Sequence, residues 1–101
     1  MATKLTLTTE QKRNLYPRVK NFLNSTEVLR RGDGSEAKPN GLVVELQEAL
    51  LALGFELPVF GVDGIFRDET KAAVEAYQRA SRLTVDGVVG EGTITSLIID
   101  L

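Results

Sequence analysis

The sequence predicts an all-α fold: a compact three-helix bundle with an internal helix-loop-helix duplication, preceded by an N-terminal helical extension. Apolar residues recur at helical spacing in several separate stretches, and the nine residues 62–70 return in similar form at 85–93. The chain has 101 residues, 43% of them apolar, which is enough for one small core. We expect the extension to cover residues 1–27 and the bundle domain to cover residues 28–101.

The extension carries a clear signal for a helix start. Thr8 followed by Gln11 fits a capping box, so we expect a helix to begin near Thr9. Pro17 has no amide proton and should kink or divide this helix, which residues 24–26 should end. One helical face is apolar, and it either covers the bundle's own core or meets a protein partner; its members are Leu15, Val19, Phe22 and Leu23.

A second helix should follow the polar, glycine-rich segment 30–41, whose composition is typical of a loop. Asn40 is a suitable N-cap for it. Gly54 is well placed to end it in the left-handed conformation that glycine adopts readily. The apolar positions of this helix are Leu42, Val43, Leu46, Ala49, Leu50 and Leu53.

Two more helices are expected in the C-terminal part. The first should open at Asp68 or Glu69, because negative charge is favourable in the first turn of a helix. Its inner face would consist of Ala73, Val74, Tyr77 and Ala80. The last helix is short and should turn Ile94, Leu97 and Ile98 toward the core.

The repeat is the most informative feature. VDGIFRDET (62–70) and VDGVVGEGT (85–93) align without gaps and are identical at four of nine positions. In each copy we expect a buried valine, a glycine with positive φ, and an aspartate that accepts downstream amide hydrogens. The two apolar residues after the glycine should fill the core. Gln47 and Gln78 lie on the preceding helices, where they can bind the loop backbone.

The order of these motifs closely resembles that of the peptidoglycan-binding-like domain family over about residues 28–99. Two departures concern Arg67-Asp68, where Gly-Pro is usual in the family, and Ile94, where tryptophan is frequent. The matching segments are Val28-Leu-Arg-Arg-Gly32, Leu46-Gln47-x-x-Leu50-x-x-Leu53-Gly54, Val62-Asp-Gly-Ile-Phe66, Thr70-x-x-Ala73-Val74, Tyr77-Gln78, Leu83-x-Val85-Asp-Gly-Val-Val-Gly90 and Thr93.

The resemblance implies a non-catalytic binding module for bacterial cell-wall peptidoglycan that targets or tethers a partner or an attached enzyme. Its ligand would be peptidoglycan or a fragment of it, and its partner a cell-wall hydrolase or another protein. The alternative is a protein-docking or assembly subunit that reuses the fold without binding glycan. The N-terminal extension and the missing tryptophan motivate that alternative, as does the division of charge. Residues 1–38 carry eight basic and four acidic side chains, whereas residues 39–101 carry four basic and ten acidic ones.

A ligand should find hydrogen-bonding groups, guanidinium donors for carboxylates and an aromatic face beside the two Asp-Gly loops. For Asp63 and Asp86 the structural alternative is turn formation, and for Tyr77 it is a core position with the hydroxyl at the edge. Arg30, Arg31 and Arg67 are the strongest ligand candidates of the set. The full candidate site is Arg30, Arg31, Asp63, Arg67, Tyr77 and Asp86.

Composition excludes several classes of function. Without cysteine or histidine the chain has no thiol nucleophile, Ser-His-Asp triad or zinc-thiolate site, so we expect no enzyme, metal or cofactor. Its basic residues are scattered without interleaved aromatics, which disfavours nucleic acid. No apolar run could span a bilayer or form a secretory signal. We therefore expect the chain in the cytoplasm, or in the cell envelope if another route or a larger protein carries it there.

Overall fold

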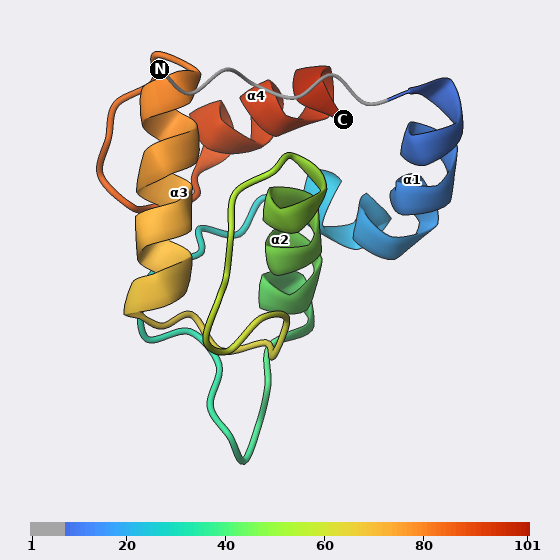
Figure 1. The fold of residues 1–101 in the computed structure, drawn as a ribbon. Coiled ribbons are helices and arrows are strands. Elements are labelled where there is room, and N and C mark those ends of the chain that lie inside the picture. Colours follow the sequence, from blue (N-terminus) through green and yellow to red (C-terminus); the bar gives the residue numbers. More distant parts are fainter. Residues whose placement is uncertain (1–7) are drawn as a thin grey trace.

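The computed structural model describes residues 8–101, and residues 1–7 of the predicted extension lie outside that range. The described part is all-helical, which confirms the predicted fold class. Helices α2 and α3 stand side by side, α4 crosses one end of the pair, and α1 lies beyond α2 (Figure 1). None of these helices has the length and apolar character that crossing a membrane requires. In chain order they are α1 (Thr9–Leu23), α2 (Gly41–Ala52), α3 (Asp68–Ala80) and α4 (Glu91–Asp100).

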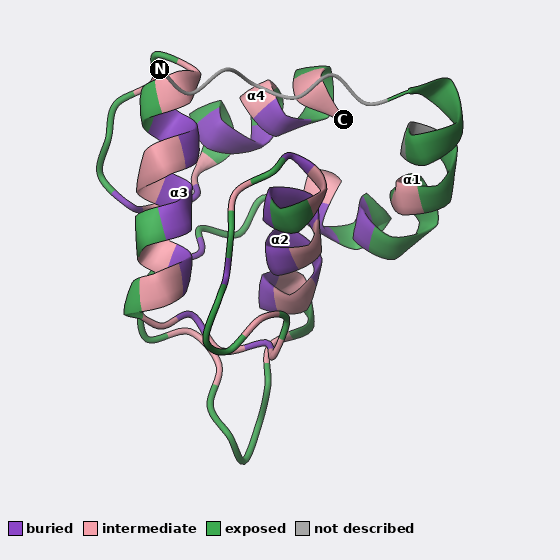
Figure 2. Cartoon of the chain, in the orientation of Figure 1, coloured by how far each residue is buried: buried purple, intermediate pink, exposed green. Residues whose placement is uncertain are grey.

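The core lies where α2, α3 and α4 face one another (Figure 2). The Phe55 ring meets Tyr77 edge-on, with 5.6 Å between the ring centroids. Two expected inward residues are not buried: Ala80 is half-buried and Ile98 is 51% exposed. Since α4 crosses the end of the bundle, only one of its sides can meet the core. The buried cluster is Phe22, Leu29, Val43, Leu46, Leu50, Leu53, Leu57, Phe66, Ala73, Val74, Tyr77, Val89, Ile94 and Leu97.

Helix α1 packs onto α2 and contributes to the same core. The predicted capping box is present, with Thr8 and Gln11 bonding to each other's backbone amides. Pro17 lies inside α1 without ending it, and the helix axis bends along its length (Figure 1). The apolar face buries Val19 and Phe22 completely, as expected for a stripe that covers the bundle's own core. The division at residue 27 stays a prediction.

The ends of α2 and α3 follow the sequence signals, with one exception. The Asn40 side chain accepts the amides of Leu42 and Val43, and Gly54 adopts φ +90° just after α2. Helix α3 begins at Asp68, as predicted. At its other end Arg82 takes φ +59°, the left-handed position that a glycine fills after α2.

The two Asp-Gly turns correct two predictions. Val62 and Val85 are not buried anchors, because 38% and 41% of their surfaces are exposed. Of the two apolar residues after each glycine, only the second is buried, namely Phe66 and Val89, and the first is half-buried. The turn presents its backbone amides to the preceding helix, so the valine that comes before the aspartate faces outward.

A candidate ligand surface beside the first Asp-Gly turn

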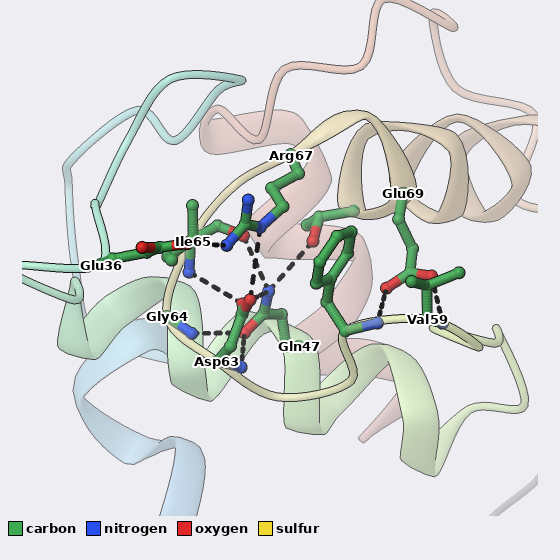
Figure 3. A network of polar contacts seen from close by, with 10 residues as sticks. Glu36, Gln47, Val59, Asp63, Gly64, Ile65, Arg67 and Glu69 are labelled. Atoms are coloured by element: carbon green, nitrogen blue, oxygen red, sulfur yellow. Dashed lines mark hydrogen bonds and ion pairs between the residues drawn. The ribbon is translucent and has the colours of Figure 1, made fainter.

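The first turn is built around one buried glutamine. Gln47 of α2 is 1% exposed, and its Oε1 accepts the amides of Asp63 and Gly64 at 3.0 and 2.9 Å. Its Nε2 donates to Asp63 Oδ1, the Ile65 carbonyl and Thr70 Oγ1 at 3.0–3.1 Å (Figure 3). Five bonds from one side chain therefore hold the loop against α2 and the start of α3, as the sequence predicted.

The second turn has the same arrangement around Gln78 of α3. Its Oε1 accepts the amides of Asp86 and Gly87 at 3.1 and 3.0 Å. Its Nε2 donates to Asp86 Oδ1, the Val88 carbonyl and Thr93 Oγ1 at 2.9–3.2 Å. The hydrogen-bond pattern thus recurs position by position, while a duplication as its origin stays a prediction.

Residues 29–34 run across both turns. Leu29 exchanges backbone hydrogen bonds with Val89 of the second turn at 3.0 and 2.8 Å. Phe66 of the first turn accepts from the Gly32 amide and donates to the Asp33 carbonyl. A Cβ on Gly34 would lie 2.1 Å from the Gly64 carbonyl oxygen, so this close approach requires glycine. The arginines between these anchors consequently sit on a fixed backbone.

Both turn aspartates are parts of the scaffold. Asp63 Oδ1 accepts the Ile65 amide at 3.0 Å, and Asp86 Oδ1 accepts the Val88 amide at 2.9 Å. Burial raises the pKa of Asp63, but hydrogen bonds from Ile65, Gln47 and Arg67 outweigh it and hold the pKa below 3.8. For Asp86 the Val88 amide is the largest cause of a lowered pKa. Each carboxylate stays ionised and already has partners in the turn.

Arg67 and Phe60 form a partly exposed cation-aromatic pair. The Arg67 guanidinium carbon lies 4.2 Å from the centroid of the Phe60 ring. Its Nε is 3.5 Å from Asp63 Oδ2, and its Nη2 is 3.6 Å from Glu36 Oε1 (Figure 3). Half of the Phe60 surface is open to solvent. Arg67 is thus held on one side by the turn carboxylate and on another by an aromatic ring.

Glu69 fixes the loop that carries Phe60. Its two carboxylate oxygens accept the backbone amides of Val59 and Phe60 at 2.6 and 2.9 Å (Figure 3). Val59 is 75% exposed and Phe60 is 50% exposed, so this end of the loop displays two apolar side chains to solvent. Charge-assisted bonds of this kind are stronger than neutral ones, so the ring is held in place before any ligand arrives.

These groups surround a shallow depression of about 610 Å³. Arg31 and Asp68 form an ion pair at its edge, with exposed side chains on both sides of the pair. The structure therefore brings together Arg31 and Arg67 of the predicted site. The residues lining the depression are Arg31, Gly32, Phe60, Phe66, Arg67, Asp68 and Glu69.

Asp63 adjoins this surface through its contact with Arg67, and the other three candidates lie elsewhere. Tyr77 is 0% exposed, and its hydroxyl donates to Asp100 at 2.6 Å and bonds to Ser96 at 2.8 Å. Burial, with the Asp100 hydrogen bond, raises the pKa of Tyr77 to about 12. Asp86 belongs to the second turn and borders a separate depression with Thr84. Arg30 is exposed and does not line the first depression, although its amide donates to the Asp33 carboxylate at 2.8 Å.

Phe60 and Glu69 were not among the residues predicted from the sequence. One signal for Phe60 was available, because residues 55–60 contain four large apolar side chains and a proline in a segment predicted to be a loop. A signal for Glu69 lay in the repeat, where Gly92 stands at the equivalent position. A glutamate present in only one of two matching turns is not needed to form the turn.

Comparison with known proteins identifies the fold. A family model described as "Putative peptidoglycan binding domain" matches residues 39–97, more than half of the chain. The chain belongs to this family. Peptidoglycan-binding domains of the family are helical, in agreement with the four helices of the described range.

Individual relatives agree with the family match. The N-acetylmuramoyl-L-alanine amidase CwlL of Bacillus licheniformis is 39% identical over 71 residues, or 69% of this chain and 18% of the amidase. The SleB N-terminal domain has a TM-score of 0.62 and 35% identity, over 74% of this chain and 93% of that domain. A peptidoglycan-binding protein from Clostridioides difficile, solved with glutamine hydroxamate, has a TM-score of 0.61 and 30% identity, over 71% of this chain and 40% of that protein. The chain spans about a fifth of the amidase's length.

Proposed function

We propose that this protein is a non-catalytic module that binds bacterial cell-wall peptidoglycan and thereby targets or tethers an enzyme or another partner. Membership of the peptidoglycan-binding domain family supports peptidoglycan as the ligand. We place binding at the depression beside the first turn. The observation that carries this placement is the Phe60 ring, half exposed and held between Arg67 and the Glu69-bound loop. An exposed aromatic face beside guanidinium donors suits sugar rings and peptide carboxylates.

Two of the carboxylates near the depression, Asp63 and Glu69, support the absence of catalysis. Glycoside hydrolysis needs one carboxyl group with a raised pKa that acts as an acid. Asp63 has a lowered pKa; its Oδ1 accepts from Ile65 and Gln47, and its Oδ2 pairs with Arg67. Both oxygens of Glu69 accept backbone amides. These groups serve the loops, which leaves neither placed for proton transfer.

Tethering follows from the size of the surface. A depression that is shallow and solvent-facing should bind each wall unit weakly. Linkage to a second binding or catalytic domain turns weak binding into retention, because the linker raises the effective concentration of the polymer. The similar amidase is about five times longer than the matched segment, which fits a module that works beside other domains.

Co-sedimentation with purified, insoluble sacculi tests the proposal. We expect the 101-residue chain to sediment with sacculi, and Phe60→Ala and Arg67→Gln each to weaken retention about fivefold. Val59→Ala, in the same loop, and Arg79→Gln, on the exposed face of α3, are the matched controls and should bind as the parent chain does. A parent chain that stays in the supernatant would refute wall binding. Equal losses in the controls would refute the assigned surface.

One observation favours the second candidate function, docking of a protein. An apolar depression of about 580 Å³ lies between α1 and the end of α4, where Tyr16 and Ile98 are 54% and 51% exposed. If docking is the function, Tyr16→Ser with Ile98→Ser should abolish association with a partner or a second copy, as measured by light scattering. Under the wall-binding proposal the same double variant should sediment with sacculi unchanged.

A further inference from the structure

The first-turn surface carries charges of both signs in close alternation. Two guanidinium groups, on Arg31 and Arg67, face Asp68 and Glu36 respectively. Asp63 and Glu69 add two more carboxylates beside them. Carboxylates therefore outnumber guanidinium groups, so a simple anion would meet net repulsion at this surface. A neutral sugar would leave all of these charges unused.

The four carboxylates fall into two pairs with different roles. Asp63 and Glu69 accept backbone amides and are committed to the scaffold. The side chains of Asp68 and Glu36 are 81% and 87% exposed, and within residues 8–101 each is paired with one guanidinium group. Exposed ion pairs of this kind are worth little in water, so a ligand can replace either partner at small cost.

The second turn lacks this charge arrangement. Gly90 and Gly92 stand where the first turn has Arg67 and Glu69, yet all the glutamine bonds of the turn are present. The turn therefore does not require the charged groups. Their presence on one copy alone points to a role in binding.

We propose that this surface recognises the zwitterionic end of a wall stem peptide, where an ammonium and a carboxylate share one carbon atom, and not the glycan strand. The inference rests on the proposed function. The ligand carboxylate pairs with the guanidinium groups of Arg31 and Arg67, while the ligand ammonium pairs with Asp68 or Glu36. The carboxylate that the ammonium does not meet is more than four-fifths exposed, so the loss of its guanidinium partner to the ligand costs little. The alkyl stem of the ligand can lie against the exposed part of Phe60.

Calorimetric titration with four defined probes tests the inference. The first is a disaccharide-tripeptide ending in meso-diaminopimelate with a free amino-carboxylate end. The second has that carboxylate amidated, the third has that amine acetylated, and the fourth is a peptide-free glycan strand. We expect the first to bind, each blocked peptide to bind about tenfold more weakly, and the glycan not to bind measurably. Free meso-diaminopimelate should compete only weakly, because it lacks the rest of the polymer unit.

Variants connect the charge pattern to the surface. Arg31→Gln and Arg67→Gln should remove the preference for the free end, and Asp68→Asn should reduce the penalty for acetylating the amine. Arg79→Gln is the matched control and should preserve all preferences. Thermal unfolding of each variant shows whether a loss of binding reflects a loss of fold.

The outcomes separate the two proposals. If the chain sediments with sacculi but binds free and blocked peptides equally, the zwitterion inference is wrong and the proposal of wall binding is supported. Tight binding of free diaminopimelate would show a receptor for the soluble amino acid and would also overturn the inference. If neither sacculi nor any probe is bound, wall binding itself fails.

Discussion

The two Asp-Gly turns share their interior and differ on their surface. Gln47 and Gln78 make equivalent bonds to the turn backbone, the aspartate and the threonine of the next helix. On the outside, the first turn carries Arg67 and Glu69, whereas the second has glycine at both positions. The glutamine hydrogen bonds therefore form with either set of outer residues. The outer residues are free to differ between the turns and can serve binding.

The turns also differ in their distance along the chain from the glutamine that holds them. Gln47 lies 16 residues before its aspartate, and Gln78 lies 8 residues before its own. The longer connection includes residues 55–60, which present Phe60 beside Arg67. The added residues change the surface but leave the hydrogen bonds of the turn intact. These bonds depend on how the helix packs against the turn, and the number of residues between the glutamine and the turn does not affect them.

We expect the largest effect on stability from replacing each of the two glutamines. Gln47→Leu and Gln78→Leu each remove the partner of two backbone amides, one aspartate oxygen and one buried threonine hydroxyl. We expect each to lower the free energy of unfolding by about 3 kcal/mol, a large fraction of the total for a domain of this size. Thermal unfolding followed by circular dichroism measures both. If one variant costs under a third of the other, the two turns do not play equal structural roles.

A smaller effect should come from the segment that clamps the first turn. Gly34→Ala places a Cβ 2.1 Å from the Gly64 carbonyl oxygen at φ +80°, so the backbone must move. The expected loss is about 2 kcal/mol, from the clash and the strained conformation together. Gly32→Ala is the control, since a Cβ there meets nothing within 4 Å and only the strain at φ +103° applies. Similar melting temperatures for the two variants would contradict the close approach.

The turn aspartates predict how stability depends on pH. Both pKa values are lowered in the folded state, Asp63 chiefly by hydrogen bonds that outweigh its burial and Asp86 by the Val88 amide. The two ionised aspartates therefore stabilise the folded state fully above pH 3.8, the ordinary pKa. This stabilisation is lost as the pH falls below 3.8 through their folded-state pKa values. Urea unfolding between pH 2 and 6 measures it, and Asp63→Asn or Asp86→Asn should each flatten the acid limb. An unchanged acid limb in both variants would mean that these carboxylates contribute nothing.

The smallest effect compares the ends of α2 and α3. Gly54 and Arg82 occupy equivalent left-handed positions, with φ values of +90° and +59°. Arg82→Gly should stabilise the chain by about 0.5 kcal/mol, because the strain of a side chain there exceeds the entropy cost of glycine. Gly54→Ala should destabilise it by about 1 kcal/mol for the converse reason. Differential scanning calorimetry resolves both shifts, and a lower melting temperature for Arg82→Gly would indicate that the arginine makes a stabilising contact.

Local signals in the sequence determined most of the architecture. The capping box at Thr8, the Asn40 cap and the left-handed Gly54 depend on neighbouring residues alone, so the helix boundaries could be predicted. The role of the glutamines also followed, because a compact polar loop must find partners for its amides. The exposure of Val62 and Ile98 did not follow, since it depends on which side of a turn or a helix has a neighbour.

Only the tertiary structure decided which residues make up the candidate surface. Arg31 comes from the segment between α1 and α2, whereas Phe60 and Arg67 come from the segment between α2 and α3. The backbone bonds of residues 29–34 to the two turns bring these segments together. The tertiary structure also placed Tyr77 in the core, which was one of the two alternatives from the sequence, and Asp86 beside the other turn. Periodicity and capping act over a few residues, whereas a binding surface depends on contacts between segments that no local pattern encodes.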